Sequence, residues 1–207
     1  MIGTEQDSFQ RIELDARALE HNLRLFRRLV SPGTALLGVV KSNAYGHGLA
    51  EVAPLALRDA EWLGVHSSAE AKSLRRVVVD CPILVMGFVP ARDLEGLDRD
   101  VHLVISSAEA LEWVADYRRR SGVSLPVHLK VDIGTKRQGV VHEQIPDLCR
   151  QAAREGVELV GVAGHFANIE DTIEHEFARY QLSLFHQALE RVGAECGELP
   201  PYIHAAC

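Results

Sequence analysis

The 207-residue sequence predicts an α/β protein of the (β/α)8 TIM-barrel type in which about seven of the eight β/α units are present. Short runs rich in β-branched residues alternate with longer amphipathic runs, as is typical of βαβ units around a parallel sheet. No G-x-G-x-x-G follows an early strand, which disfavours a doubly wound dinucleotide fold. A closed barrel usually takes about 250 residues, so we expect an incomplete barrel whose chain stops inside its seventh strand.

The expected elements follow one another in a regular order. The first helix begins at its capping residue, Asp15, and ends before Pro32-Gly33. Its apolar residues recur at helical spacing and are Leu19, Leu23, Phe26 and Val30. Strands are expected at residues 35–41, 62–66, 83–87, 101–105, 127–132, 159–164 and 202–206. Helices are expected between them at residues 48–58, 67–78, 91–97, 107–120, 142–155 and 175–192.

The composition is that of an ordinary soluble globular chain, with 47% hydrophobic and 25% charged residues. A net charge of −7 gives no general electrostatic reason to bind nucleic acid or an anionic membrane surface. No run approaches the roughly 18 apolar residues of a membrane span, and the N-terminus lacks a signal-peptide pattern. We therefore expect a cytoplasmic protein with no nucleic-acid and no membrane partner.

Neither a domain boundary nor a metal site is indicated by the sequence. No linker or low-complexity tract divides the chain, so one domain over residues 1–207 is expected. The cysteines form no C-x-x-C pair and have no regular spacing, which argues against a disulfide framework and a zinc site; they are Cys81, Cys149, Cys196 and Cys207. Reduced thiols and no metal are the expectation.

Lys41 lies where an apolar run gives way to a polar segment punctuated by glycines, residues 42–48. An ammonium group beside so much hydrocarbon is disfavoured, so we expect the pKa of Lys41 to be lowered and its amine to be nucleophilic near neutral pH. Such an amine can form a Schiff base. The alternative is a lysine at a strand end whose ammonium group reaches solvent.

Other chemically capable residues also follow the expected strands, where the active sites of barrels are found. They are Tyr45 and His47 after the first strand, Lys130, Asp132, Gly134 and Arg137 around the end of the fifth, His165 after the sixth and His204 in the seventh. Lys130 and Asp132 share one strand face, so a structural charge pair is an equally acceptable interpretation. His165 is also compatible with a hydrogen-bonded core histidine.

Four segments in order resemble the N-terminal barrel of the alanine racemase family, and the resemblance covers nearly the whole chain. Residues 39–48, VVKSNAYGHG, resemble the family's lysine signature, and residues 12–22 resemble its opening segment. Residues 128–139, HLKVDIGTKRQG, are similar to the fifth-strand motif. Residues 161–167, GVAGHFA, and 203–206, IHAA, resemble the sixth- and seventh-strand motifs.

The resemblance implies an isomerase that uses pyridoxal 5'-phosphate and interconverts L- and D-alanine, with a role in D-alanine metabolism. Lys41 would hold the cofactor as a Schiff base and act as one acid or base at the Cα atom. Tyr45 corresponds to a residue near the cofactor phosphate, and His165 to one against the pyridine ring. Arg137 corresponds to an arginine near the phenolic oxygen and the substrate carboxylate, groups that suit a guanidinium fork.

Further properties are implied by the resemblance alone. Lys130 corresponds to a lysine that is carbamylated in many members, and a carbamate there would be an anion able to hold Arg137; if the amine is unmodified, Asp132 becomes the compensating group. In the family, the second catalytic base is a tyrosine from the C-terminal domain of a partner subunit, which implies a homodimer for the full-length enzyme. The sequence assigns none of its residues to that base, so we expect this chain to be a fragment with little or no racemase activity.

The sequence also departs from the family's usual motifs near the expected substrate carboxylate. The departures are Ser42, Ile133, Thr135, Lys136, Gln138 and Cys207. Alanine is therefore the family default, and racemisation of another amino acid is an open alternative. Two further alternatives are a single-domain regulatory protein that binds pyridoxal phosphate on the same barrel, and an unrelated barrel with a reactive lysine, such as an aldolase. The ordered motifs disfavour the last.

Overall fold

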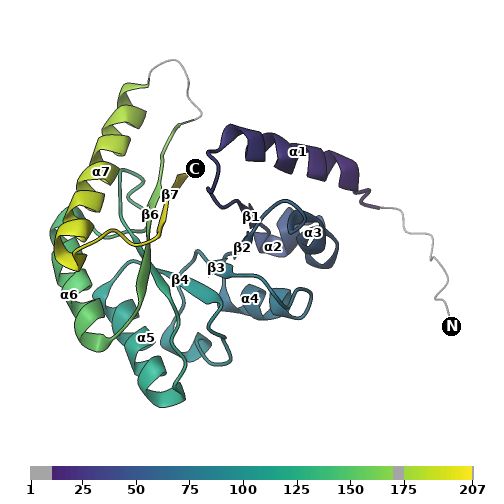
Figure 1. Ribbon diagram of the computed structural model, residues 1–207. Helices are drawn as coiled ribbons and strands as arrows, with labels where there is room; N and C mark the ends of the chain where they lie inside the picture. The colour runs from purple at the N-terminus through teal and green to yellow at the C-terminus, as the bar shows by residue number, and fades with distance from the viewer. Residues whose placement is uncertain (1–10, 170–174, 207) are drawn as a thin grey trace.

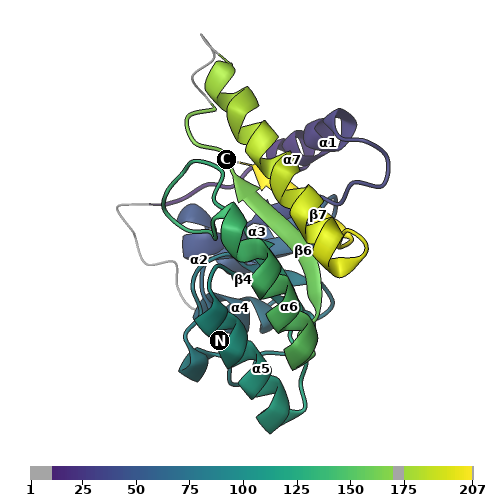
Figure 2. The same ribbon diagram turned by 90° about the vertical axis from the view of Figure 1, so that its left-hand side faces the viewer.

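The computed structural model describes residues 11–169 and 175–206, and its seven strands form one parallel sheet. Each strand pairs with the next in sequence, in the order β1-β2-β3-β4-β5-β6-β7. The sheet curls and the helices lie along its outer side, while β1 and β7 are its two edges (Figures 1 and 2). The predicted incomplete (β/α) barrel is therefore confirmed.

All seven predicted strands are present, most of them within a few residues of the expected bounds. They are β1 Leu37–Val39, β2 Trp62–Val65, β3 Ile83–Val85, β4 Val101–Ile105, β5 Val127–Lys130, β6 Leu159–His165 and β7 Tyr202–Ala206. The expected first strand, residues 35–41, is too long at both ends. It stops at Val39 because Lys41 already opens a helical turn, α2, of residues Lys41–Tyr45.

The helices alternate with the strands as the sequence predicts. They are α1 Ala16–Leu29, α3 Leu49–Ala56, α4 Ser68–Arg75, α5 Ala108–Ser121, α6 Ile145–Glu155, preceded by a 3-10 turn η2 His142–Gln144, and α7 Glu176–Cys196. The prediction of a helix at residues 91–97 was wrong. Only one 3-10 turn, η1 Ala91–Asp93, forms there, because Pro90 is extended and Gly96 has a left-handed φ of 76°.

The core lies between the sheet and the helices that follow each strand. Strand residues such as Leu63, Ile83 and Leu129 are almost fully buried, as are Leu111 on α5 and Ile145 on α6. Helix α1 is different. None of its residues, all of which the structure describes, is fully buried, so the predicted apolar stripe of this helix is only partly covered.

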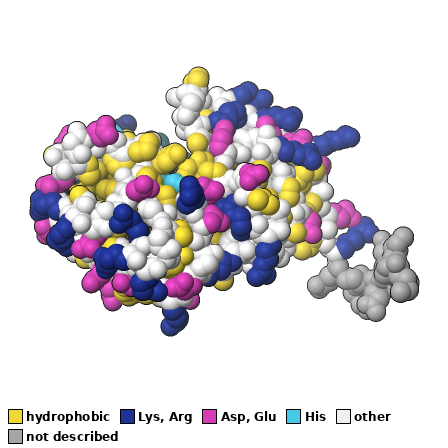
Figure 3. All heavy atoms as spheres, turned by 60° about the horizontal axis from the view of Figure 1, so that its bottom comes forward, with side chains coloured by type: hydrophobic (Ala, Val, Ile, Leu, Met, Phe, Trp, Pro, Cys, Tyr) yellow, Lys and Arg dark blue, Asp and Glu magenta, His cyan; other side chains and the backbone are white. Residues whose placement is uncertain are grey.

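The surface offers no broad region of a single charge on the face shown in Figure 3. Basic and acidic side chains are interspersed there over the described residues. In the part of the chain that the structure describes, no helix is both long enough and apolar enough to cross a membrane.

Candidate functional site

The predicted site residues lie at or just after the carboxyl ends of β1, β5 and β6. In a parallel sheet these ends all point to the same side of the barrel. Lys41 comes two residues after β1, Lys130 is the last residue of β5, and His165 is the last residue of β6. Parallel strands bring their carboxyl ends to the same side of a barrel, where side chains from different strands can converge. The fold therefore places these residues on one face of the molecule.

Lys41 is presented by a backbone turn of unusual hand. The next four residues all have left-handed φ angles, which are 54° at Ser42, 55° at Asn43, 53° at Ala44 and 56° at Tyr45. This conformation costs an L-residue about 1–2 kcal/mol, and consecutive non-glycine residues adopt it only when the surroundings hold them there. Strain of this kind is concentrated at functional sites.

Hydrogen bonds from both sides hold the left-handed turn. Glu70 on α4 accepts a hydrogen bond from the backbone N–H of Ser42 at 2.6 Å through Oε1, and another from the N–H of His66 at 2.7 Å through Oε2. The Asn43 side chain accepts one from the N–H of Leu49 at 2.8 Å, at the start of α3. These bonds connect the turn to both helices that follow it.

The hydrogen bonds that Glu70 accepts also change the pKa of its carboxyl group. Burial alone would raise the pKa of its carboxyl group, but hydrogen bonds from the N–H groups of Ser42, His66 and Ser67 outweigh it and lower the pKa below 4.5. The ionised Glu70 carboxylate thus stabilises the folded state above pH 4.5, and this contribution is lost as the pH falls through the lowered folded-state pKa of Glu70. The sequence indicates only one of the two roles of Glu70, its capping box with Ser67 at the start of α4.

We expect Glu70→Gln to lower the free energy of unfolding by about 2 kcal/mol, because an amide has one acceptor oxygen and no charge. Glu109→Gln, in the first turn of α5, is the control and is expected to cost about 0.5 kcal/mol, since only the helix dipole is affected. Urea unfolding at pH 7 measures both. Equal losses would contradict the assignment of Glu70 as the support of the turn.

Lys41 begins the turn and Tyr45 ends it, and their side chains lie close to each other. The Nζ atom of Lys41 is 5.8 Å from the centroid of the Tyr45 ring, within the range of a cation–π contact. Lys41 is half-buried, whereas 60% of Tyr45 is exposed. The Lys41 side chain is therefore only partly covered and has one aromatic ring beside it.

Lys130 lies in a less polar environment at the end of β5. Its Nζ donates a hydrogen bond to the carbonyl oxygen of Gly164 at 3.0 Å, next to His165. Burial and the nearby charge of Arg137 lower the pKa of Lys130 to about 8, although Asp132 acts in the opposite direction. A sizeable fraction of this amine is therefore neutral near physiological pH.

Asp132 has a structural task in addition to its charge. Its Oδ1 accepts hydrogen bonds from the N–H groups of Gly134, at 2.9 Å, and Lys136, at 3.1 Å. The ends of this loop are joined by the hydrogen bond from the N–H of Asp132 to the carbonyl oxygen of Val140, at 3.0 Å. The loop carries Arg137, which is exposed and has no ion pair among the described residues.

The same loop depends on Gly139. Its φ is 141°, and a Cβ atom added there would lie 2.4 Å from the backbone nitrogen of Asp132. We expect Gly139→Ala to lower the free energy of unfolding by about 3 kcal/mol, because both the strain and the backbone clash must be relieved. Gly122→Ala is a matched control, since its φ is 75° and nothing lies within 4 Å; about 1 kcal/mol is expected.

Urea denaturation of the two glycine variants distinguishes strain from collision. If Gly139→Ala and Gly122→Ala lower the free energy of unfolding equally, the close approach of the backbone at Gly139 does not contribute to the loss.

Three histidines form a hydrogen-bonded row across β4, β5 and β7, in which His102 and His128 are buried and His204 is half-buried. The ring nitrogens of His102 and His128 are 3.1 Å apart, and those of His128 and His204 are 2.9 Å apart. Burial lowers the pKa of His102 to about 4, of His128 to about 2 and of His204 to about 4; neighbouring charges contribute at His128 and His204. All three are therefore neutral at pH 7. Of these three histidines only His204 was predicted from the sequence, because the three side chains come from the separate strands β4, β5 and β7.

The structure joins the predicted residues in two groups. Lys41 and Tyr45 form one, and Lys130 forms the other with the neighbouring Arg137 and the carbonyl group that precedes His165. Within residues 11–169 and 175–206, no hydrogen bond or ion pair joins Lys41 or Tyr45 to Lys130 or Arg137. A cofactor with several anionic and electrophilic groups could bridge them.

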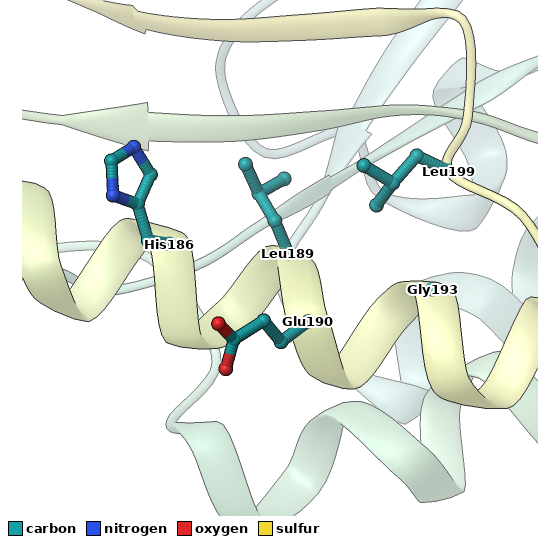
Figure 4. Close-up of a pocket in the computed structure, with 5 residues that line it drawn as sticks. All are labelled: His186, Leu189, Glu190, Gly193 and Leu199. Atoms are coloured by element: carbon teal, nitrogen blue, oxygen red, sulfur yellow. The ribbon is translucent and has the colours of Figure 1, made fainter.

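A hollow of about 420 Å³ lies elsewhere, along α7 and the chain that leads to β7. It is lined by His186, Leu189, Glu190, Gly193 and Leu199 (Figure 4). None of the predicted site residues lines it, so it is separate from the strand-end site.

Comparisons with known proteins agree with these motifs. Residues 14–207 match the family model described as "Alanine racemase, N-terminal domain". An alanine racemase of Symbiobacterium thermophilum is 36% identical over 197 residues, which are 94% of this chain and 52% of the relative. The solved alanine racemase of Clostridium difficile 630 superposes with a TM-score of 0.83 at 27% identity, covering 90% of this chain and 52% of that structure.

A histidine racemase from Leuconostoc mesenteroides subsp. sake has the same fold, with a TM-score of 0.80 and 26% identity over 92% of this chain and 51% of that structure. The chain spans about half the length of the curated relatives that it matches. The match over residues 14–207, the ordered motifs and the strand-end lysine together show that the chain belongs to the alanine racemase family, in the part that corresponds to its N-terminal domain.

Proposed function

We propose that this chain is the cofactor-binding barrel of an amino-acid racemase that depends on pyridoxal 5'-phosphate. The observation that carries the proposal is the presentation of Lys41, a half-buried lysine at the start of a strained left-handed turn, beside the Tyr45 ring. Strain at an amine-bearing turn is useful when the turn must hold one reactive atom in place. The named relatives support alanine as the first substrate to test, and the histidine racemase favours a second test with histidine.

The chemistry of the available donors suits this cofactor. Lys41 would hold it covalently, Tyr45 and His165 would contact it, and Arg137 would face its anionic oxygen. When bound, pyridoxal phosphate supplies an electron sink for cleavage of the Cα–H bond. The guanidinium group of Arg137, which lies near Lys130, matches a ligand and a substrate that both carry negative charge.

The protein's own residues then have distinct tasks. The Lys41 amine, once free, is proposed to take or return the Cα proton on one face of the substrate. Arg137 is proposed to orient the substrate carboxylate, because its guanidinium can donate two parallel hydrogen bonds. We propose that the proton on the opposite face is handled by a base contributed by a partner subunit in a homodimer.

Lys130 is a proposed site of carbamylation. Its neutral amine can attack carbon dioxide, forming a carbon–nitrogen bond and releasing one proton to solvent, which leaves a carbamate anion. The lowered pKa of about 8 favours this reaction because the neutral form is the nucleophile. Native mass spectrometry in bicarbonate buffer should reveal the added carbon dioxide, and Lys130→Arg should remove it.

The proposal is tested by incubating the chain with pyridoxal phosphate, reducing with borohydride and mapping the modified peptide. Label on Lys41 is expected. Label on Lys72, Lys130 or Lys136 alone would refute the assignment. Racemisation of alanine and of histidine is assayed in parallel. Cofactor attachment without racemisation would support a binding role for residues 1–207, with catalysis requiring further residues.

A further inference from the structure

Helices α6 and α7 pack side by side on the outside of the barrel (Figures 1 and 2). The buried residues of α7 recur every three or four positions, at Phe185, Ala188 and Val192. One more step of four reaches Cys196, the last residue of this helix. Cys196 is therefore at the end of the stripe that α7 turns toward the core and its neighbouring helix.

Cys149 lies opposite, on the buried side of α6. It belongs to the core, with only 4% of its surface exposed, whereas Cys196 is exposed. The adjacent residues also meet, because Arg150 donates to Glu195 at 2.8 Å across the two helices. The two cysteines are thus each next to a residue of this contact, and they face one another across the two helices.

We propose that Cys149 and Cys196 form a thiol pair that closes to a disulfide when it meets a small-molecule disulfide. The Arg150–Glu195 ion pair holds the two helices together beside these thiols. Gly197, in a left-handed conformation, ends α7 directly after Cys196 and gives that end of the helix freedom to adjust.

The reaction starts at the exposed cysteine. The Cys196 thiolate attacks one sulfur of the small disulfide, forms a mixed disulfide and releases one small thiolate. The Cys149 sulfur, after its proton passes to solvent or to that thiolate, then attacks the Cys196 sulfur and displaces the second small thiolate. The protein loses two electrons and two protons, and one small disulfide becomes two thiols.

The second step is expected to be the slower one. Burial, together with the charge and hydrogen bond of Cys196, raises the pKa of Cys149 to about 12, so its thiolate is rare near neutral pH. The rate of ring closure should therefore rise with pH. Cys81 provides an internal comparison, because burial also raises its pKa.

Closure would join residues 149 and 196 across a loop of roughly 50 residues that contains β6. Cross-links of this length restrict the unfolded chain strongly and are expected to raise the Tm of a protein of this size by about 10 °C. The bond would thereby fix α6 against α7 without touching the strand-end site.

The test is to incubate the intact chain with oxidised glutathione at pH 8.5, block free thiols, and digest without reductant. A Cys149–Cys196 cross-linked peptide and a Tm about 10 °C higher, reversed by dithiothreitol, are expected. In Cys149→Ser the mixed disulfide should remain on Cys196 and the Tm should not rise. Cys81→Ser should behave like the unaltered chain.

Two outcomes would overturn the proposal. One is glutathione retained on Cys196 of the unaltered chain while Cys149 stays free after prolonged incubation. The other is a cross-link that involves Cys81 or Cys207 in place of Cys149.

Discussion

Replacement of Lys41 by alanine is expected to reduce borohydride-trapped pyridoxal phosphate from stoichiometric to background, because no other lysine lies on the left-handed turn. The cofactor could then bind only through noncovalent contacts, and we expect its dissociation constant to rise by about 100-fold or more. Fluorescence titration and peptide mapping measure the two effects. The fold should persist, since Glu70 binds the backbone N–H of Ser42 rather than the lysine side chain.

A matched variant separates this chemical role from a general loss of positive charge. Lys72 lies on α4, and its Nζ donates a hydrogen bond to the carbonyl oxygen of Asp93 at 3.3 Å. Lys72→Ala removes this amine. It should leave trapping at Lys41 unchanged. Loss of trapping in both variants, or retention in Lys41→Ala, would show that the reactive amine is elsewhere.

Acidification from pH 7 to pH 4 is expected to produce the largest loss of stability, because of the hydrogen-bonded row of histidines. Their folded-state pKa values are lowered, whereas the unfolded chain takes up protons near pH 6.5. The unfolded state therefore binds more protons between pH 6.5 and about 4, and stability falls as the pH falls through this window. For His102 and His204 the loss is about 3 kcal/mol each.

Losses of this size are comparable to the whole stability of many domains, so we expect unfolding near pH 4. The free energy of unfolding should be measured by urea titration at several pH values. His102→Asn keeps a polar atom near the position of Nδ1 and does not titrate, so it should give a shallower pH dependence. His186→Asn, at an exposed position on α7, should leave the pH dependence of the free energy of unfolding unchanged. Identical slopes in all three proteins would exclude the histidine row as the cause.

The sequence predicted the sheet well because each β/α unit is encoded locally. A buried strand, a turn and an amphipathic helix leave their periodicity within about 30 residues, and every strand pairs with its sequence neighbour. Lys41 and His165 could be placed at strand ends for the same reason. The prediction was wrong at residues 91–97, where backbone conformation at Pro90 and Gly96 outweighs helical spacing.

The parts of the site that could not be predicted are contacts between distant segments. Glu70 is 28 residues from Ser42 and is a capping residue in its own helix, so its second role is invisible locally. His102 and His128 meet only because β4 and β5 pair, with His128 opposite Val104. The left-handed turn after Lys41 also has no sequence sign, since only glycines usually indicate that conformation.

The sequential strand order has a consequence for how the chain acquires its structure. Because β1 pairs with β2, β2 with β3, and so on to β7, every sheet contact joins segments that are synthesised one after the other. Pairing between strands that are neighbours in sequence keeps the separation, and so the entropic cost of closing each contact, lower than pairing between distant strands would. The sheet can therefore grow one β/α unit at a time as the polypeptide leaves the ribosome, without waiting for its last strand.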